Sequence, residues 1–189
     1  MEILTNLVLG VCLSAACGFR VFAPLLVMSL AALGGFFTPD ESLAWLETWP
    51  AAALFGTATA VEVAAYYVPI ADNFLDTIAT PAALVAGVLA SASVLGELPP
   101  GLQWFVAAVA GGGAAGIVQT ATVLLRGTST LTTGGAGNPI VATVENLLSV
   151  LTPALALVVP AIVFLGLMTA GVWAARVITS RRRMRPSPT

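Results

Sequence analysis

The sequence predicts an all-α membrane protein with about six membrane segments, some of them broken or re-entrant. Hydrophobic residues make up 58% of the 189 residues and charged residues only 8%, which leaves a water-soluble fold too little polar surface. The long apolar runs are also interrupted by proline, glycine or a charged residue. We therefore expect helices that cross the bilayer and that bend or break within it.

A short polar segment occurs twice in the chain. Its copies are DNFLDTIATPA at residues 72–82 and ENLLSVLTPA at residues 145–154, each with an acid, then Asn, and Thr-Pro-Ala before an apolar run. A repeat in corresponding places of two halves is typical of transporters built from inverted halves. We therefore predict a single integral membrane domain over residues 1–178, made of two inverted three-segment halves, residues 1–98 and 102–178.

The first apolar run, residues 3–37, is longer than the roughly 20 residues that a helix needs to cross the hydrocarbon. It contains Gly18, Arg20 and Pro24. Because proline has no N–H to donate, Pro24 is expected to free the carbonyl of residue 20. The run should therefore break where a cation and a free acceptor lie together.

The rest of the first half is expected to hold an interfacial segment and two crossings. Residues 38–50 include Trp45 and Trp49, which suit a short amphipathic helix among the lipid headgroups. The two crossings are residues 51–70, with Glu62 near the middle, and residues 74–98. The aromatic residues expected at the membrane interfaces are Tyr66, Tyr67, Trp104 and Trp173.

The second half begins with an expected crossing at residues 102–125. In it Gly112 and Gly116 form a face of small residues, which lets helices approach closely within the chain or in a homo-oligomer. Residues 128–138 are polar but uncharged, so they suit non-helical backbone that is buried or lines a wet cavity.

Two last segments, residues 139–151 and 153–178, are expected to be divided at Pro153. This proline should free the carbonyl of Ser149, just as Pro81 should free that of Thr77. As an alternative, residues 128–151 form a re-entrant loop. The chain then has five crossings and its N-terminus lies outside.

The cations predict the orientation. Four of the seven are Arg181, Arg182, Arg183 and Arg185, within residues 179–189. By the positive-inside rule these residues form a basic cytoplasmic tail, and with six crossings both termini are cytoplasmic. We expect a multi-pass protein of the bacterial inner membrane, in contact with membrane lipid and not with nucleic acid.

Three motifs point to a known family. They are GFRVFAPLL at residues 18–26, Asp72-Asn73-x-x-Asp76 followed by Pro81, and Gly134-x-x-Gly137-Asn138-Pro139 followed by Glu145. Together they resemble an uncharacterised family of bacterial integral membrane proteins, the domain of unknown function 4126 (DUF4126). The resemblance covers nearly the whole chain except the C-terminal tail. It implies a compact multi-helix membrane domain and assigns no catalytic residue, cofactor or substrate.

Charged residues inside the apolar runs are the candidate functional residues. Each costs about 2.5–3.5 kcal/mol at the bilayer centre, so we expect Arg20 to pair with Asp76 or Glu62, and Arg126 with Glu145. The expected pathway residues are Arg20, Glu62, Asp76, Asn138 and Glu145. The expected supporting residues are Asp72, Asn73, Arg126, Asn146, Pro24, Pro81 and Pro153. As an alternative, these are interfacial residues that cap helix ends.

These features predict a small transporter or channel-like protein for a small ion or polar solute, with Glu62 as the acid that carries a coupling proton. The alternative is a non-transporting scaffold or assembly partner whose buried charges are structural. The chain has no His and no Gly-x-Ser-x-Gly turn, so we expect no enzyme, no cofactor and no metal site. Asp72 and Asp76, one helical turn apart, leave a lipid-processing enzyme as a remote alternative.

Overall fold

The structure, a computed structural model, describes residues 2–67 and 69–183, with the side chains of these residues except 69–76, 174 and 177–183. All secondary structure in this part is helical, which confirms the predicted class. The elements in chain order are α1 (Glu2–Cys17), α2 (Phe22–Leu33), the 3₁₀ helix η1 (Glu41–Glu47), α3 (Trp49–Tyr66), α4 (Pro69–Ala92), α5 (Pro100–Val106), the π-helix η2 (Ala107–Gly112), α6 (Gly113–Thr133), α7 (Asn138–Val158) and α8 (Pro160–Arg183).

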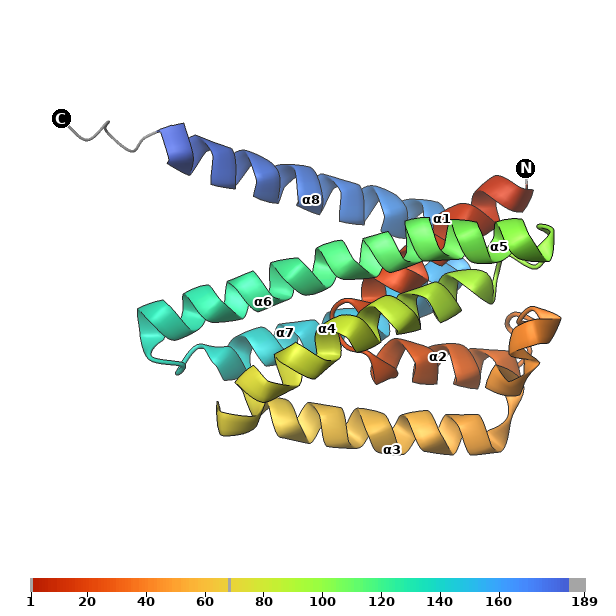
Figure 1. The fold of residues 1–189 in the computed structure, drawn as a ribbon, viewed down its shortest axis with the longest axis horizontal. Coiled ribbons are helices and arrows are strands. Elements are labelled where there is room, and N and C mark those ends of the chain that lie inside the picture. The colour runs from red at the N-terminus through yellow and green to blue at the C-terminus, as the bar shows by residue number, and fades with distance from the viewer. Residues whose placement is uncertain (1, 68, 184–189) are drawn as a thin grey trace.

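Helices α1 and α2 form a hairpin that goes only part of the way along the bundle (Figure 1). Its outer end, which we call the N-terminal end of the bundle, is fixed to the chain that follows α4. There the Asn6 amide donates to Glu97 over 3.4 Å, and the backbone N–H of Asp40 donates to the carbonyl of Ser93 over 2.9 Å. Helix α1 therefore begins, and helix α2 ends, at the N-terminal end of the bundle.

The turn of this hairpin, residues 18–21, is called here the hairpin tip. It reaches the middle of the molecule because Gly18 lies against Ala115, about halfway along the continuous helix Pro100–Thr133. A Cβ at Gly18 would lie 2.5 Å from the Ala115 carbonyl oxygen, so this approach requires glycine. A break in the first apolar run was expected, but it lies at residues 18–21 and reverses the chain.

Pro24 does not cause that break. It lies in the first turn of α2, where a backbone N–H has no acceptor within its own helix. The carbonyl of residue 20 is therefore not freed by the loss of a helical hydrogen bond, and this part of the sequence prediction was wrong. Proline here suits the start of a helix, since its φ is fixed near the helical value.

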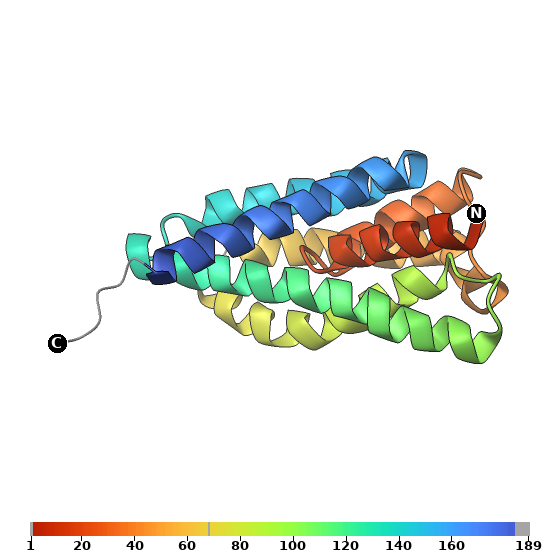
Figure 2. The same ribbon diagram turned by 90° about the horizontal axis from the view of Figure 1, so that it is seen from above.

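The longer helices run between the two ends of the bundle (Figures 1 and 2). Helices α4 and α7, which carry the two copies of the repeat, begin at the same end, where the Tyr67 hydroxyl lies 2.9 Å from the Thr143 hydroxyl. Both then run in the same direction in Figure 1. An inverted repeat would place these helices in opposite directions, so the two copies are not related in the way the sequence predicted.

Two expected boundaries in the second half were also wrong. Residues 128–133 are the last turns of α6, and only residues 134–137 form a turn, with φ of 63° at Gly134 and 91° at Gly135. Helix α7 continues through Pro153 and ends at Val158, so residues 139–151 are neither a separate segment nor a re-entrant loop. The chain breaks at Val159, and Pro160 begins α8.

The interfacial segment forms as a short helix. The 3₁₀ helix η1 buries Leu43 and Leu46, while Glu41 and Glu47 are exposed. Trp45 and Trp49 are also exposed, at 43% and 73%. This amphipathic pattern is the one predicted for residues 38–50.

The core combines apolar side chains with buried polar and charged ones, and much of the outer surface is apolar. Large apolar side chains are exposed on several helices, including Val61 at 67%, Ile117 at 74% and Ile162 at 68%. Among the described residues, Pro100–Thr133 and Asn138–Val158 are long and apolar enough to cross a membrane. Apolar helices of this kind indicate association with a membrane.

The small-residue face of the fourth predicted segment lies inside the molecule. A Cβ at Gly112 would lie 3.2 Å from Val88, and one at Gly116 would lie 2.8 Å from Leu84, both on α4 of the same chain. This close packing uses the glycines within the chain, the first of the two roles that the sequence predicted. A homo-oligomer through Gly112 and Gly116 stays a prediction, and α4 occupies part of that face.

Candidate functional site

A buried carboxylate, Glu145 of α7, accepts hydrogen bonds from two arginines. Arg20, at the hairpin tip, donates from Nη1 to Oε2 over 2.8 Å. Arg126, from α6, donates from Nη2 to Oε2 over 2.8 Å and from Nε to Oε1 over 3.2 Å. The three side chains are at most 3% exposed, so one anion joins the tip, α6 and α7 inside the protein.

The other donors of Arg20 also find acceptors. Its Nε donates to the side-chain oxygen of Asn146 over 2.6 Å and its Nη2 to the carbonyl of Ala142 over 3.3 Å, both on α7. Its Nη1 also donates to the carbonyl of Phe19 over 3.2 Å. A guanidinium held along its whole edge has little freedom, because its donors form a rigid planar fork. Arg20 thus fixes the position of the hairpin tip against α7.

Tyr66, at the end of α3, lies with its ring against both arginines of the site. Its ring centroid is 3.8 Å from the guanidinium carbon of Arg20 and 4.3 Å from that of Arg126. Cations over an aromatic face are stabilised by about 2 kcal/mol when water is excluded, and Tyr66 is only 3% exposed. The prediction that Tyr66 belongs to an interfacial belt was therefore wrong.

Glu62, also on α3, holds the tip from the opposite side. Its Oε1 accepts the backbone N–H of Val21 over 2.8 Å and its Oε2 that of Phe22 over 3.1 Å. These N–H groups belong to the start of α2, where a helix has unsatisfied donors and a partial positive charge. Glu62 therefore caps α2 from a neighbouring helix. Among the described side chains, no cation lies within ion-pair distance of its carboxylate.

We refer to Arg20, Glu62, Tyr66, Arg126, Glu145 and Asn146 as the charged cluster. Its described ionisable groups, two arginines and two glutamates, balance one another in charge. Burying such charges is tolerated only when the geometry is good and the remaining donors find partners. The contacts above meet that condition, and they close the cluster to solvent.

The structure brings most of the predicted pathway residues together, in a different pairing. Arg126 pairs with Glu145 as expected, but Arg20 pairs with Glu145 and not with Glu62. Asn138 lies apart, at the start of α7, where its amide donates to the Thr130 hydroxyl over 3.0 Å.

The remaining predicted residues have varied positions. Asp72, Asn73 and Asp76 lie in the first turns of α4, and their side chains fall outside the described part of the chain. Pro81 and Pro153 lie inside α4 and α7, the first exposed and the second buried. Neither proline ends its helix.

A pocket of about 390 Å³ lies beside the cluster, between α2, α3 and α4; we call it the α2–α3–α4 pocket. Its lining includes Phe22, Leu54, Val61 and Ile78, and it reaches Glu62 and Tyr66. A volume of this size is within the usual range for small-molecule sites, about 300–1,000 Å³. The pocket thus touches the charged cluster at these two residues.

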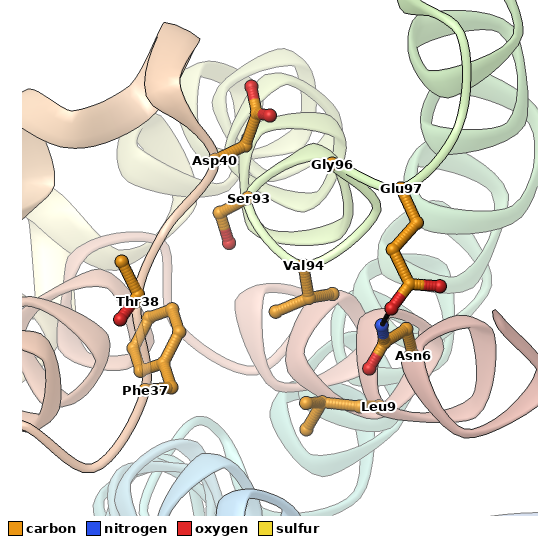
Figure 3. A pocket seen from close by; sticks show the side chains of 9 residues that line it. All are labelled: Asn6, Leu9, Phe37, Thr38, Asp40, Ser93, Val94, Gly96 and Glu97. Carbon is orange, nitrogen blue, oxygen red and sulfur yellow. Dashed lines mark hydrogen bonds between the residues drawn. The ribbon is translucent and has the colours of Figure 1, made fainter. Parts of the chain in front are cut away.

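A second hollow, of about 300 Å³, lies at the N-terminal end of the bundle (Figure 3). Two acids line it, but each has a task in the fold. Ser42 donates its N–H and hydroxyl to Asp40, which holds the pKa of that carboxyl below its usual range, and Asn6 donates to Glu97. The two carboxylates point to different sides of Gly96 in Figure 3. These contacts join the loops at this end.

A family model matches residues 7–180, nearly all of the chain from α1 to α8. It is described as a domain of unknown function, DUF4126. The chain belongs to this family. The motif that gave the resemblance at residues 18–26 contains the hairpin tip with Arg20, and the motif that ends at Glu145 contains the acceptor of the two arginines.

Searches of curated proteins and of solved structures found no match. Membership of the DUF4126 family supplies no activity, since the description names none. The function must therefore be argued from the charged cluster and its surroundings.

Replacement of Glu145 by alanine should strongly destabilise this DUF4126 protein. It removes the shared acceptor and leaves Arg20 and Arg126 without it in a buried site, which costs about 3–5 kcal/mol when a buried pair is broken. The free energy of unfolding in detergent, from denaturant titration, measures the effect. Glu47→Ala, at an exposed acid of η1, is the matched control and should change stability by about 0.5 kcal/mol or less. Equal effects of the two substitutions would contradict this account.

Proposed function

We propose that this protein is a small inner-membrane transporter or channel-like protein for a small ion or polar solute. The observation that carries the proposal is a buried charged cluster at the tip of a helical hairpin that stops halfway through the bundle. Broken backbone at membrane depth is tolerated where it is buried in protein or lines a cavity, and ionisable residues there commonly mark pathways for ions and solutes.

The proposed arrangement in the membrane has five crossings and one re-entrant hairpin. The crossings are α3, α4, the continuous helix from α5 to α6, α7 and α8, and the hairpin is α1 with α2. The two ends of the described chain lie at opposite ends of the bundle in both views (Figures 1 and 2). With the arginines near the C-terminus in the cytoplasm, the start of α1 faces outside. This arrangement has the same number of crossings and the same outside N-terminus as the five-crossing alternative, but its re-entrant part is residues 2–33 and not residues 128–151.

Within this arrangement the charged cluster supplies a polar site. The start of α2 directs N–H donors toward the cluster, and the arginines supply positive charge beside it. A conformational change that separates Glu145 from one arginine would open donors and an acceptor to a passing ion. In the present structure the cluster is closed, as in an occluded state of a transporter.

The second candidate is a non-transporting scaffold, and one observation favours it. Arg20 uses Glu145, Asn146 and backbone carbonyls of its own chain as acceptors, so the cluster serves equally to hold the hairpin in place. Flux separates the two functions, because a scaffold moves no solute.

The orientation is tested with reporter fusions. A reporter at the N-terminus should be active outside the cytoplasm, and one at the C-terminus inside it, because the two ends lie on opposite sides. Paired fusions to alkaline phosphatase and to a fluorescent protein measure this. If both termini were cytoplasmic, the chain would have an even number of crossings, which would contradict the re-entrant hairpin.

Transport is tested in proteoliposomes with a panel of small ions and polar solutes. The double variant Arg126→Gln/Glu145→Gln removes one buried charge of each sign but leaves Arg20 without its anionic acceptor, so its folding is first checked by size-exclusion chromatography in detergent. The folded variant should change the flux of at least one member of the panel about tenfold. The matched control is Arg176→Gln/Glu47→Gln, which removes one exposed charge of each sign and should leave flux unchanged. Equal flux for the wild type, the cluster variant and empty liposomes across the panel would favour the scaffold.

A further inference from the structure

The α2–α3–α4 pocket is buried at one end and open at the other. Its inner end is formed by Val21, Glu62 and Tyr66, which are 4%, 6% and 3% exposed. Its mouth is formed by Leu54 and Val61 of α3 and Ile78 of α4, which are 62%, 67% and 52% exposed. The pocket therefore leads from the apolar outer surface of the bundle to the hairpin tip.

This mouth faces the hydrocarbon in the proposed arrangement. Leu54, Val61 and Ile78 lie on helices proposed to cross the bilayer, and large apolar side chains on such helices contact lipid tails. A ligand that enters here comes sideways from the membrane and must have an apolar body. Of the substrates proposed above, this route therefore favours an ion with an apolar body over a polar solute.

The charged side chain that lines the inner end of the pocket is the carboxylate of Glu62. Its two carboxylate oxygens accept hydrogen bonds from the neutral backbone N–H groups of Val21 and Phe22. Arg20 and Arg126 lie close enough to Glu62 to interact with its charge, but they donate to Glu145 and do not line the pocket. Each carboxylate oxygen has two lone pairs, so Glu62 keeps acceptor capacity beyond its two bonds. A buried carboxylate in apolar surroundings is stabilised by an added positive charge.

We propose that the α2–α3–α4 pocket binds a lipophilic organic cation, with its apolar body among the pocket walls and its positive charge beside Glu62. The proposal rests on the proposed transport function and names the substrate class of the same site. The cation reaches the pocket from the bilayer through the gap at Leu54, Val61 and Ile78. In this proposal the carboxylate of Glu62 favours a positively charged ligand, and the apolar walls favour a ligand whose remaining surface is apolar.

Binding of radiolabelled tetraphenylphosphonium to the detergent-purified protein tests the proposal. Tetraphenylborate, measured separately, has nearly the same shape and the opposite charge. The wild type should bind the phosphonium with saturation and at least about tenfold more tightly than the borate. Equal affinity for the two ions, or no saturable binding of the phosphonium, would overturn the proposal, because the pocket would then be an apolar groove for lipid tails.

Three variants locate the site. Glu62→Gln keeps an acceptor for one backbone N–H and removes the charge, so phosphonium affinity should fall about tenfold or more. Ala58→Phe fills the half-buried lining of the pocket and keeps the charge of Glu62, and it should also abolish binding. Ala53→Phe, on an exposed part of α3 that does not line the pocket, is the control and should bind as the wild type does. If the folded Ala58→Phe variant binds the phosphonium as tightly as the wild type, the proposal is overturned, even if Glu62→Gln does not fold.

Flux of the phosphonium into proteoliposomes is measured beside binding, so the two proposals fail separately. Saturable, charge-selective binding without flux supports the pocket and counts against transport. Flux of inorganic ions without phosphonium binding supports transport and overturns the assignment of this pocket.

Discussion

The sharing of Glu145 by Arg20 and Arg126 is the interaction on which the rest of the structure depends. It joins the hairpin tip, α6 and α7 through side chains that are at most 3% exposed. With Glu145 on one side of the tip and Glu62 on the other, the turn between α1 and α2 is held by charge from both directions. A hairpin of two short helices needs such contacts, because its turn would otherwise leave backbone groups unsatisfied inside an apolar bundle.

This constraint links the fold to the proposed function. The contacts that hold the tip in place also concentrate charge, donors and a helix start in the middle of the molecule, with an apolar pocket beside them. A protein that needed only stability could fill this volume with apolar side chains, which is often as stable as a buried ion pair. The proposed function assigns these charges, together with the pocket that ends at Glu62, to a site that meets a charged ligand.

The sequence predicted the helical class and the residues of the cluster better than it predicted the path of the chain. Charges inside apolar runs are costly, so Arg20, Glu62, Arg126 and Glu145 were recognisable without a structure. The pairing of these residues could not be predicted, because Arg20 and Glu145 are 125 residues apart and sequence spacing carries no information about such distant contacts.

Pro24, Pro81 and Pro153 were predicted as breaks, but proline is tolerated at a helix start and, where neighbours compensate, inside membrane helices. The position of the turn could not be predicted either, because it depends on the close approach of Gly18 to Ala115, which is a tertiary contact. Tyr66 was missed because a tyrosine near a helix end suits an interface equally well; its position one turn after Glu62 was the available signal.

A double-mutant cycle between Arg20 and Glu145 tests the central claim most directly. The free energy of unfolding in detergent is measured for the wild type, Arg20→Gln, Glu145→Gln and the double variant. A direct buried ion pair predicts a coupling energy of about 1.5 kcal/mol or more between the two positions. Effects that add within about 0.5 kcal/mol would show that the hairpin tip is not held by Glu145, and the account of both the fold and the site would fail.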